Sequence, residues 1–94
     1  MITVRVQYYS ILRRAAGLEG KAIDVPNGST IRDALNHLVA GSGNALRSLL
    51  LTPEGGVVPY LVVFRNQRLV THDQFDTKLI DGDELKLFPA VSGG

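Results

Sequence analysis

Residues 29–41, Ser-Thr-Ile-Arg-Asp-Ala-Leu-Asn-His-Leu-Val-Ala-Gly, carry the clearest helix signal in the chain and are the basis for assigning its fold. Thr30 and Asp33 have the spacing of a capping box, in which each side chain accepts a hydrogen bond from the backbone N–H of the other. Gly41 is expected to end the helix. Between these limits the apolar residues recur every three or four positions, which predicts one buried stripe on an amphipathic helix: Ile31, Leu35, Leu38 and Val39.

Segments with the patterns of β-strands lie before and after this helix. Ile2–Tyr8 alternates apolar and polar residues with a period of two, as a half-buried strand does. Tyr60–Arg65 is apolar on both faces, which favours a central position in the sheet. Further strands are predicted at residues 21–25, 68–70 and 84–88, the last one after the turn sequence Asp81-Gly82-Asp83.

Two short helices are predicted in the connections. Ser10 is expected to cap the first of them, which runs through Ala16 and is followed by Gly17 in the left-handed conformation. The second covers residues 44–51 and is expected to turn its apolar side chains inward: Leu46, Leu49 and Leu50.

The element order indicates the fold class. Asn66-Gln67 lacks the glycine that a two-residue type I′ turn prefers, so we expect a longer loop between strands 60–65 and 68–70. Strands around one principal helix indicate an α+β domain rather than repeated βαβ units. We therefore expect a β-grasp arrangement over residues 1–88, with a mixed sheet of about five strands packed on the main helix. Residues 89–94 are expected to form a flexible, extended C-terminal tail.

The composition excludes several functional classes. Ninety-four residues fit one domain, and the net charge of +1 lacks the basic excess of a dedicated nucleic-acid binder. The chain has no cysteine, which removes disulfides, thiolate metal sites and a cysteine nucleophile. No apolar run approaches the length of a membrane span, and the residues after Met1 do not resemble a signal peptide, so a cytoplasmic protein is expected.

Side-chain motifs for catalysis or metal binding are weak. Gly41-Ser42-Gly43 follows a helix, whereas a phosphate-binding glycine loop precedes one. The acidic residues near the last turn lack the spacing of a calcium-binding loop, and the two histidines have no partner at ligand spacing. We therefore expect no metal and no stably bound cofactor. The acidic residues are Asp76, Asp81, Asp83 and Glu84, and the histidines are His37 and His72.

The final residues, Phe88-Pro89-Ala90-Val91-Ser92-Gly93-Gly94, point to a different kind of reactive group. Pro89 stiffens the exit from the last strand, and the two glycines carry no Cβ atom. A main-chain carboxylate on such a narrow stem can enter a channel that side chains would block. A search for catalytic side chains does not find this group.

With these features the chain resembles the ubiquitin-like sulfur carriers of the MoaD/ThiS family, most closely the MoaD type. The resemblance rests on residues 81–94, where the Asp-Gly-Asp turn leads a strand into the Gly-Gly end. It also rests on residues 26–35, Pro-Asn-Gly-Ser-Thr-Ile-Arg-Asp-Ala-Leu, at the start of the main helix. It covers essentially the whole chain.

The resemblance implies a chemistry centred on Gly94. A MoeB-like adenylating enzyme would use ATP to convert its carboxylate to an acyl-adenylate, and a persulfide sulfur would replace AMP to leave a thiocarboxylate. The sulfur would pass to the large subunit of molybdopterin synthase, whose small subunit this chain would be, or to another sulfur-accepting synthase. Gly93 would let the tail extend into the partner. The expected partner-binding residues are Phe88, Pro89, Ala90, Val91 and Ser92.

Several alternatives stay open. The chain could carry sulfur for cysteine, thiamine or tRNA thiolation, or be a protein modifier joined through Gly94 to substrate lysines, or be a plain interaction domain. Phe88 could be an exposed partner contact or part of ordinary edge packing. The sequence does not say which alternating set of residues 60–64 accompanies it. Partners among nucleic acids and membranes are not expected.

Overall fold

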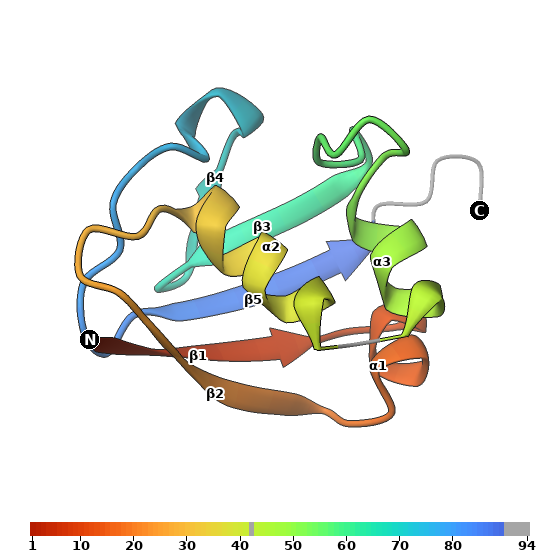
Figure 1. Cartoon of the computed structure of the whole chain (residues 1–94), viewed down its shortest axis with the longest axis horizontal. Coiled ribbons are helices and arrows are strands. Elements are labelled where there is room, and N and C mark those ends of the chain that lie inside the picture. Colours follow the sequence, from red (N-terminus) through yellow and green to blue (C-terminus); the bar gives the residue numbers. More distant parts are fainter. Residues whose placement is uncertain (42, 90–94) are drawn as a thin grey trace.

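The computed structural model describes residues 1–41 and 43–89 (Figure 1). A single sheet lies behind the main helix α2, and α1 and α3 lie together near one end of it (Figure 1). No helix within these residues is long and apolar enough to cross a membrane. In chain order the elements are β1 (Ile2–Tyr8), α1 (Ile11–Ala16), β2 (Gly20–Val25), α2 (Ile31–Ala40), α3 (Asn44–Leu50), β3 (Leu61–Arg65), β4 (Arg68–Val70), the 3-10 helix η1 (His72–Gln74) and β5 (Glu84–Pro89).

The strands form one mixed sheet of five in the order β2-β1-β5-β3-β4. β1 is parallel to β5, with Val6 opposite Leu85, and the other neighbouring pairs are antiparallel. The parallel pair brings the first and last strands of the chain together in the middle of the sheet (Figure 1). This topology confirms the predicted α+β, β-grasp fold.

The centre of the sheet is β5, not the segment 60–65. β3 begins at Leu61 and lies between β5 and the edge strand β4, so the prediction that it is central is wrong. Its two apolar faces have a different origin, because one face contacts the core and the other contacts aromatic rings outside it. β5 extends to Pro89, one residue beyond the predicted strand, and Pro89 pairs with Leu61.

The core lies between α2 and the inner face of the sheet. The capping box is present: the N–H of Asp33 donates to Thr30 Oγ1 over 3.1 Å, and the N–H of Thr30 donates to Asp33 Oδ2 over 2.9 Å. α2 ends before Gly41, as predicted. The predicted apolar stripe is buried against inward-facing strand residues, with exposures of at most 5%: Ile31, Leu35, Leu38 and Val39 meet a sheet face that includes Val4, Val6, Leu85 and Leu87.

Both short helices are present, and one cap differs from the prediction. Ser10 occupies the N-cap of α1, but its side chain makes no capping hydrogen bond. Its φ of +59° lies outside the extended region from which a capping hydroxyl reaches the first N–H groups of a helix. Gly17 has the predicted left-handed conformation, with φ of +76°. α3 turns its leucines toward the core, with Leu46 and Leu50 buried and Leu49 half-buried.

The β3–β4 hairpin is tighter than the sequence predicts. Arg65 pairs with Arg68, so Asn66 and Gln67 alone form the loop, with φ of +49° and +72°. These are the signs of a type I′ turn, which favours Asn at its first position and Gly at its second, so Gln67 carries a cost of roughly 1–2 kcal/mol. Asn66 offsets this cost by bonding β5: its N–H donates to Glu84 O and its Oδ1 accepts from the N–H of Glu84, both over 2.9 Å. The expectation of a longer loop is therefore wrong.

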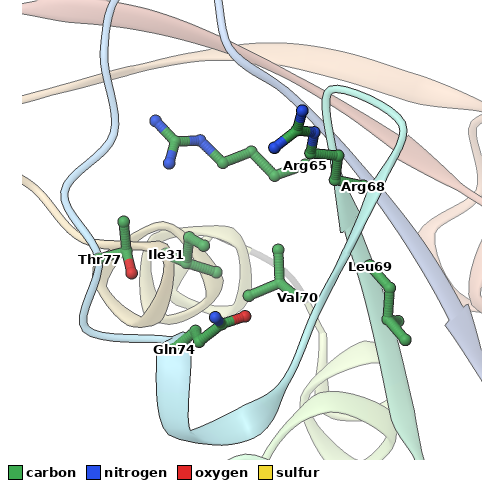
Figure 2. A pocket seen from close by; sticks show the side chains of 7 residues that line it. All are labelled: Ile31, Arg65, Arg68, Leu69, Val70, Gln74 and Thr77. Carbon is green, nitrogen blue, oxygen red and sulfur yellow. The ribbon is translucent and has the colours of Figure 1, made fainter.

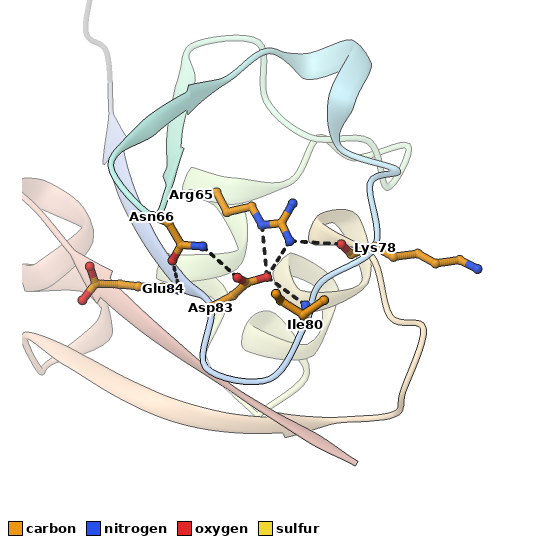
Figure 3. Close-up of polar contacts among 6 residues, drawn as sticks. All are labelled: Arg65, Asn66, Lys78, Ile80, Asp83 and Glu84. Atoms are coloured by element: carbon orange, nitrogen blue, oxygen red, sulfur yellow. Dashed lines mark hydrogen bonds and ion pairs between the residues drawn. The ribbon is translucent and has the colours of Figure 1, made fainter.

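Asp83 joins the start of β5 to its surroundings (Figure 3). Its side chain is 2% exposed. Oδ2 accepts hydrogen bonds from Nε and Nη2 of Arg65, at 3.0 and 2.8 Å, and from the N–H of Ile80 at 2.8 Å. Oδ1 accepts from Nδ2 of Asn66 at 2.8 Å. Arg65 Nη2 also donates to Lys78 O over 3.3 Å. The carboxylate of Asp83 and the guanidinium of Arg65 together connect the loop before β5, the end of β3 and the hairpin.

These contacts determine the charge state of Asp83. Burial alone would raise the pKa of its carboxyl group. The hydrogen bonds from Ile80, Asn66 and Arg65, together with the positive charge of Arg65, outweigh that effect and lower the pKa below its ordinary value. Asp83 is therefore ionised at neutral pH, and Arg65 balances its charge.

Replacement of Asp83 by asparagine should destabilise the fold by about 2–4 kcal/mol, because Arg65 then loses its counter-charge. The loss stays below that of a fully buried pair because the Arg65 side chain is 23% exposed. Urea denaturation followed by circular dichroism measures it. The matched control is Asp76→Asn, which removes the exposed ion pair with Arg32 and should cost less than about 1 kcal/mol. Equal losses in the two variants would contradict the role assigned to Asp83.

The free energy of unfolding should also fall on acidification. Because the folded-state pKa of Asp83 is lowered, its stabilising contribution is complete above the unfolded-state pKa of about 3.9 and is lost as the pH falls through the lower folded-state value. Denaturation curves from neutral to strongly acidic pH measure this dependence. The difference in stability between the wild type and Asp83→Asn should shrink over this range, and a constant difference would contradict the assignment.

Candidate functional site

The predicted site residues fall into two groups. Phe88 and Pro89 are at the end of β5 and are the last described residues. The remaining predicted residues lie outside the described part of the chain: Ala90, Val91, Ser92, Gly93 and Gly94. The candidate site in the structure is therefore the strand end that precedes them.

Neighbouring strands hold the end of β5 on both sides. On the β1 side, Tyr8 pairs with Leu87, and the N–H of Tyr9 donates to Leu87 O over 3.2 Å. On the β3 side, Leu61 pairs with Pro89. The position of Pro89 is thus determined by a paired sheet rather than by a loop.

Phe88 belongs to a cluster of three aromatic rings on the outer face of the sheet, away from the core. Its ring stacks on Tyr9, with centroids 4.3 Å apart and planes inclined by 13°. It also meets Phe64 in a T-shaped arrangement, at 5.6 Å and 78°. We call Tyr9, Phe64 and Phe88 the aromatic patch. Each of its residues is only partly buried, so Phe88 packs in the middle of the sheet and still reaches the surface.

The register shows which side of β3 accompanies Phe88. Val62 lies opposite Phe88 in the sheet, and Phe64 contacts its ring. Leu61 and Val63 point the other way and are buried in the core, at 2% and 0% exposure. The even-numbered residues of this strand therefore form the outer surface beside Phe88.

Tyr9 is a site residue that sequence reasoning missed. Its ring contacts both Phe88 and the guanidinium of Arg13, whose central carbon is 5.7 Å from the ring centroid. Arg13 is held in turn by a hydrogen bond from Nε to Tyr8 O, at 3.3 Å, and by an ion pair with Glu19, at 3.7 Å. The sequence does contain a signal for it, the doublet Tyr8-Tyr9 at the end of a predicted strand. Because successive side chains of a strand point to opposite faces, one ring turns inward and the next turns outward.

The acidic residues weighed as metal ligands make internal contacts instead. Asp81 Oδ1 accepts a hydrogen bond from a backbone N–H of β1 at 2.8 Å, Asp76 pairs with Arg32, and Asp83 holds the start of β5. His72 donates from Nε2 to a backbone carbonyl at the start of β3, over 2.8 Å. Within residues 1–41 and 43–89, no three His, Asp or Glu side chains gather as a metal site.

The aromatic patch and the strand end form one unit. Because Phe88 and Pro89 are adjacent, a protein that contacts the patch also meets the chain where residue 90 begins. Aromatic side chains are enriched at protein interfaces and contribute much of their binding energy. This geometry suits a partner surface better than an internal catalytic cleft.

Comparison with known sequences identifies relatives over almost the whole chain. The ThiS family model matches residues 6–94. Over 86 residues the chain is 35% identical to small archaeal modifier protein 1 of Haloferax volcanii, and this alignment covers 92% of the chain and 94% of that relative. It is 30% identical over 92 residues to small archaeal modifier protein 3 of the same organism, with 97% and 98% covered.

Solved structures agree with these matches. The crystal structure of SAMP1 from Haloferax volcanii superposes with a TM-score of 0.86 and 32% identity, covering 98% of this chain and 99% of that one. A chain in the crystal structure of the BexX/CysO complex from Amycolatopsis orientalis superposes with a TM-score of 0.72 and 26% identity, covering 97% and 99%. The second structure is a complex, so a similar protein associates with another protein.

Proposed function

The chain belongs to the ThiS family of ubiquitin-like sulfur carriers and small modifiers, and on this premise we propose that it is a sulfur carrier activated at the carboxylate of Gly94. The observation that carries the proposal is the family match that runs from residue 6 through Gly94. The structure adds support, because β5 brings a partly exposed aromatic surface to the base of the last residues.

The proposed reaction uses reagents that other proteins supply. A carboxylate oxygen of Gly94 attacks the α-phosphorus of ATP, pyrophosphate leaves, and an acyl-adenylate forms. A persulfide sulfur on a donor protein then attacks the acyl carbon, and AMP leaves with the electron pair of the broken C–O bond. A thiol reduces the resulting acyl disulfide and releases the thiocarboxylate. Gly93 adds no side chain, so a narrow channel can admit the stem.

The sulfur acceptor that we propose is the large subunit of molybdopterin synthase, with this chain as the small subunit. The support is the sequence resemblance over residues 81–94 and 26–35. A MoeB-like enzyme would catalyse the adenylation. Residues 88–92 of this chain would contact each partner when the chain end enters it. The alternative acceptors are the enzymes of cysteine, thiamine or tRNA thiolation.

A second outcome of the same activation is conjugation to proteins. The two curated relatives at 35% and 30% identity are named small archaeal modifier proteins, and this favours the second function. In that reaction a lysine ε-amino nitrogen attacks the activated acyl carbon of Gly94, and an isopeptide bond replaces the bond to the leaving group. Both outcomes use one chain end and one partner surface, so they are compatible in one protein.

Intact-mass analysis of the chain from its native host should find one oxygen replaced by sulfur. High-mass conjugates joined through Gly94 would support the modifier function. Deletion of Gly94 should abolish both products while the circular dichroism spectrum and unfolding midpoint stay unchanged, because the hydrophobic core and the five-stranded sheet are built from residues 2–89. A chain that stays unmodified under all growth conditions, or a Gly94 deletion that still transfers sulfur, would overturn the proposal.

Phe88→Ala should raise the KM of the chain in ATP–pyrophosphate exchange by the adenylating enzyme about tenfold, as the loss of an interface aromatic does. The kcat should change little, because the reacting carboxylate is untouched. The matched control is Ile80→Ala, which removes a side chain that is 63% exposed in the loop before β5. Unfolding curves of both variants show whether the fold is retained. Equal KM values for the two variants would exclude the aromatic patch as the docking surface.

A further inference from the structure

A cavity of about 280 Å³ lies at the end of the sheet where β5 begins (Figure 2). Its walls come from the β3–β4 hairpin, the start of α2 and the chain around η1. β5 spans six residues from there to Pro89, which is about 17 Å along an extended strand. The cavity is thus distant from Pro89 and the chain end, although its residues Arg65 and Leu69 adjoin Phe64 of the aromatic patch. Its lining residues are Ile31, Arg65, Arg68, Leu69, Val70, Gln74 and Thr77.

The lining has the chemistry of an anion site. In Figure 2 the two arginine side chains lie together on one side of the cavity, with Gln74 and Thr77 on other sides and Ile31 and Val70 between them. Among the lining residues there are two cations and no carboxylate. The Gln74 Oε1 atom already accepts a hydrogen bond from the N–H of Thr71 at 3.1 Å, so its amide NH₂ group is left as a donor.

Arg65 is held in place before any ligand arrives. Its Nε and Nη2 atoms donate to Asp83, and Nη2 also donates to Lys78 O. These bonds determine the orientation of a planar guanidinium group, and Nη1 makes no hydrogen bond within residues 1–41 and 43–89. A ligand that binds this side of the group therefore loses little side-chain entropy.

Arg68 is the unmatched charge of the cavity. It pairs with Arg65 across the hairpin, so the two side chains project from the same face of the sheet. In the described part of the chain its guanidinium has neither an ion pair nor a hydrogen-bond acceptor. Asp83 balances one of the two positive charges, and the second is uncompensated. An anion placed between them would relieve this repulsion and form charge-assisted hydrogen bonds.

The helix α2 does not supply this site. The N–H of Ile31 donates to Thr77 O over 3.2 Å, and the N–H of Arg32 donates to Phe75 O over 2.9 Å. The N–H of Asp33 is used by the capping box. These three N–H groups of α2 are therefore not available to a ligand in the cavity.

We propose that this cavity binds a small oxyanion, a phosphate or carboxylate group carried on an apolar body, through Arg65 and Arg68. The guanidinium groups would hold the charged oxygens, and the apolar body would lie against the apolar lining residues that reach solvent, Leu69 at 58% and Val70 at 9% exposure. This site goes beyond the carrier function, because it needs neither Gly94 nor the aromatic patch. It would let the domain recognise an anionic ligand while the chain end is engaged elsewhere.

The test is an NMR titration of backbone amide shifts with phenyl phosphate and with benzoate, at constant ionic strength. We expect saturable shifts at residues 70, 74 and 77, and none at Tyr9 and Phe88, the two patch residues outside the β3–β4 hairpin. Tighter binding of phenyl phosphate would assign a phosphate ligand, and tighter binding of benzoate a carboxylate ligand. Benzyl alcohol, which has the apolar body without the charge, should cause no saturable shift.

Arg68→Gln should weaken binding of the preferred probe about tenfold, as expected for the loss of a charged hydrogen-bond donor. The matched control, Arg14→Gln, removes an exposed arginine of α1 outside the cavity and should bind as the wild type does. The Gly94 deletion should also bind normally, which separates this proposal from the carrier function. The proposal is overturned if no saturable shift occurs, if benzyl alcohol binds equally well, or if Arg68→Gln and Arg14→Gln behave alike.

Discussion

The buried carboxylate of Asp83 is the contact on which the arrangement of the sheet depends. It accepts hydrogen bonds from the loop before β5, from the end of β3 and from the turn that leads to β4. Because β5 is the central strand, the position of its first residue sets the register against both β1 and β3. A shift of one residue would turn Phe88 inward and Leu87 outward. The Asp83 contacts therefore determine which side chains form the outer surface near the chain end.

The two ends of β5 have different chemical characters. At its end, Phe88 and Pro89 combine aromatic surface with a backbone held by two neighbouring strands. At its beginning, a hairpin and a capped helix enclose a cavity with an excess of positive charge. A rigid central strand connects the two regions and keeps them apart. The domain can therefore contact one partner at the chain end without using the surface at the other end.

Sequence reasoning predicted the features that local chemistry controls. The Thr30 capping box, the apolar stripe of α2 and the left-handed Gly17 are all present, because each depends on residues within a few positions of one another. The two wrong predictions about the sheet, the loop length after Arg65 and the position of β3, have one cause in common: each depends on pairing between residues that are distant in sequence. The two-residue turn after Arg65 lacks glycine and is stabilised by contacts with β5, which lies about twenty residues later in the sequence. Strand order is likewise a property of pairing and cannot be read from the apolarity of one strand.

The sequence by itself determined the fold class and the main helix, and it contains the Gly93-Gly94 motif. These features depend on periodicity, capping residues and motifs, all of which involve residues close to one another in the chain. The tertiary structure decided that Tyr9 stacks on Phe88, since only the parallel pairing of the first and last strands brings those rings together. It also decided that Arg65 and Arg68 share a cavity while one of them is neutralised by Asp83. Both outcomes require residues distant in sequence to meet, and long-range strand pairing is the physical step that local patterns do not specify.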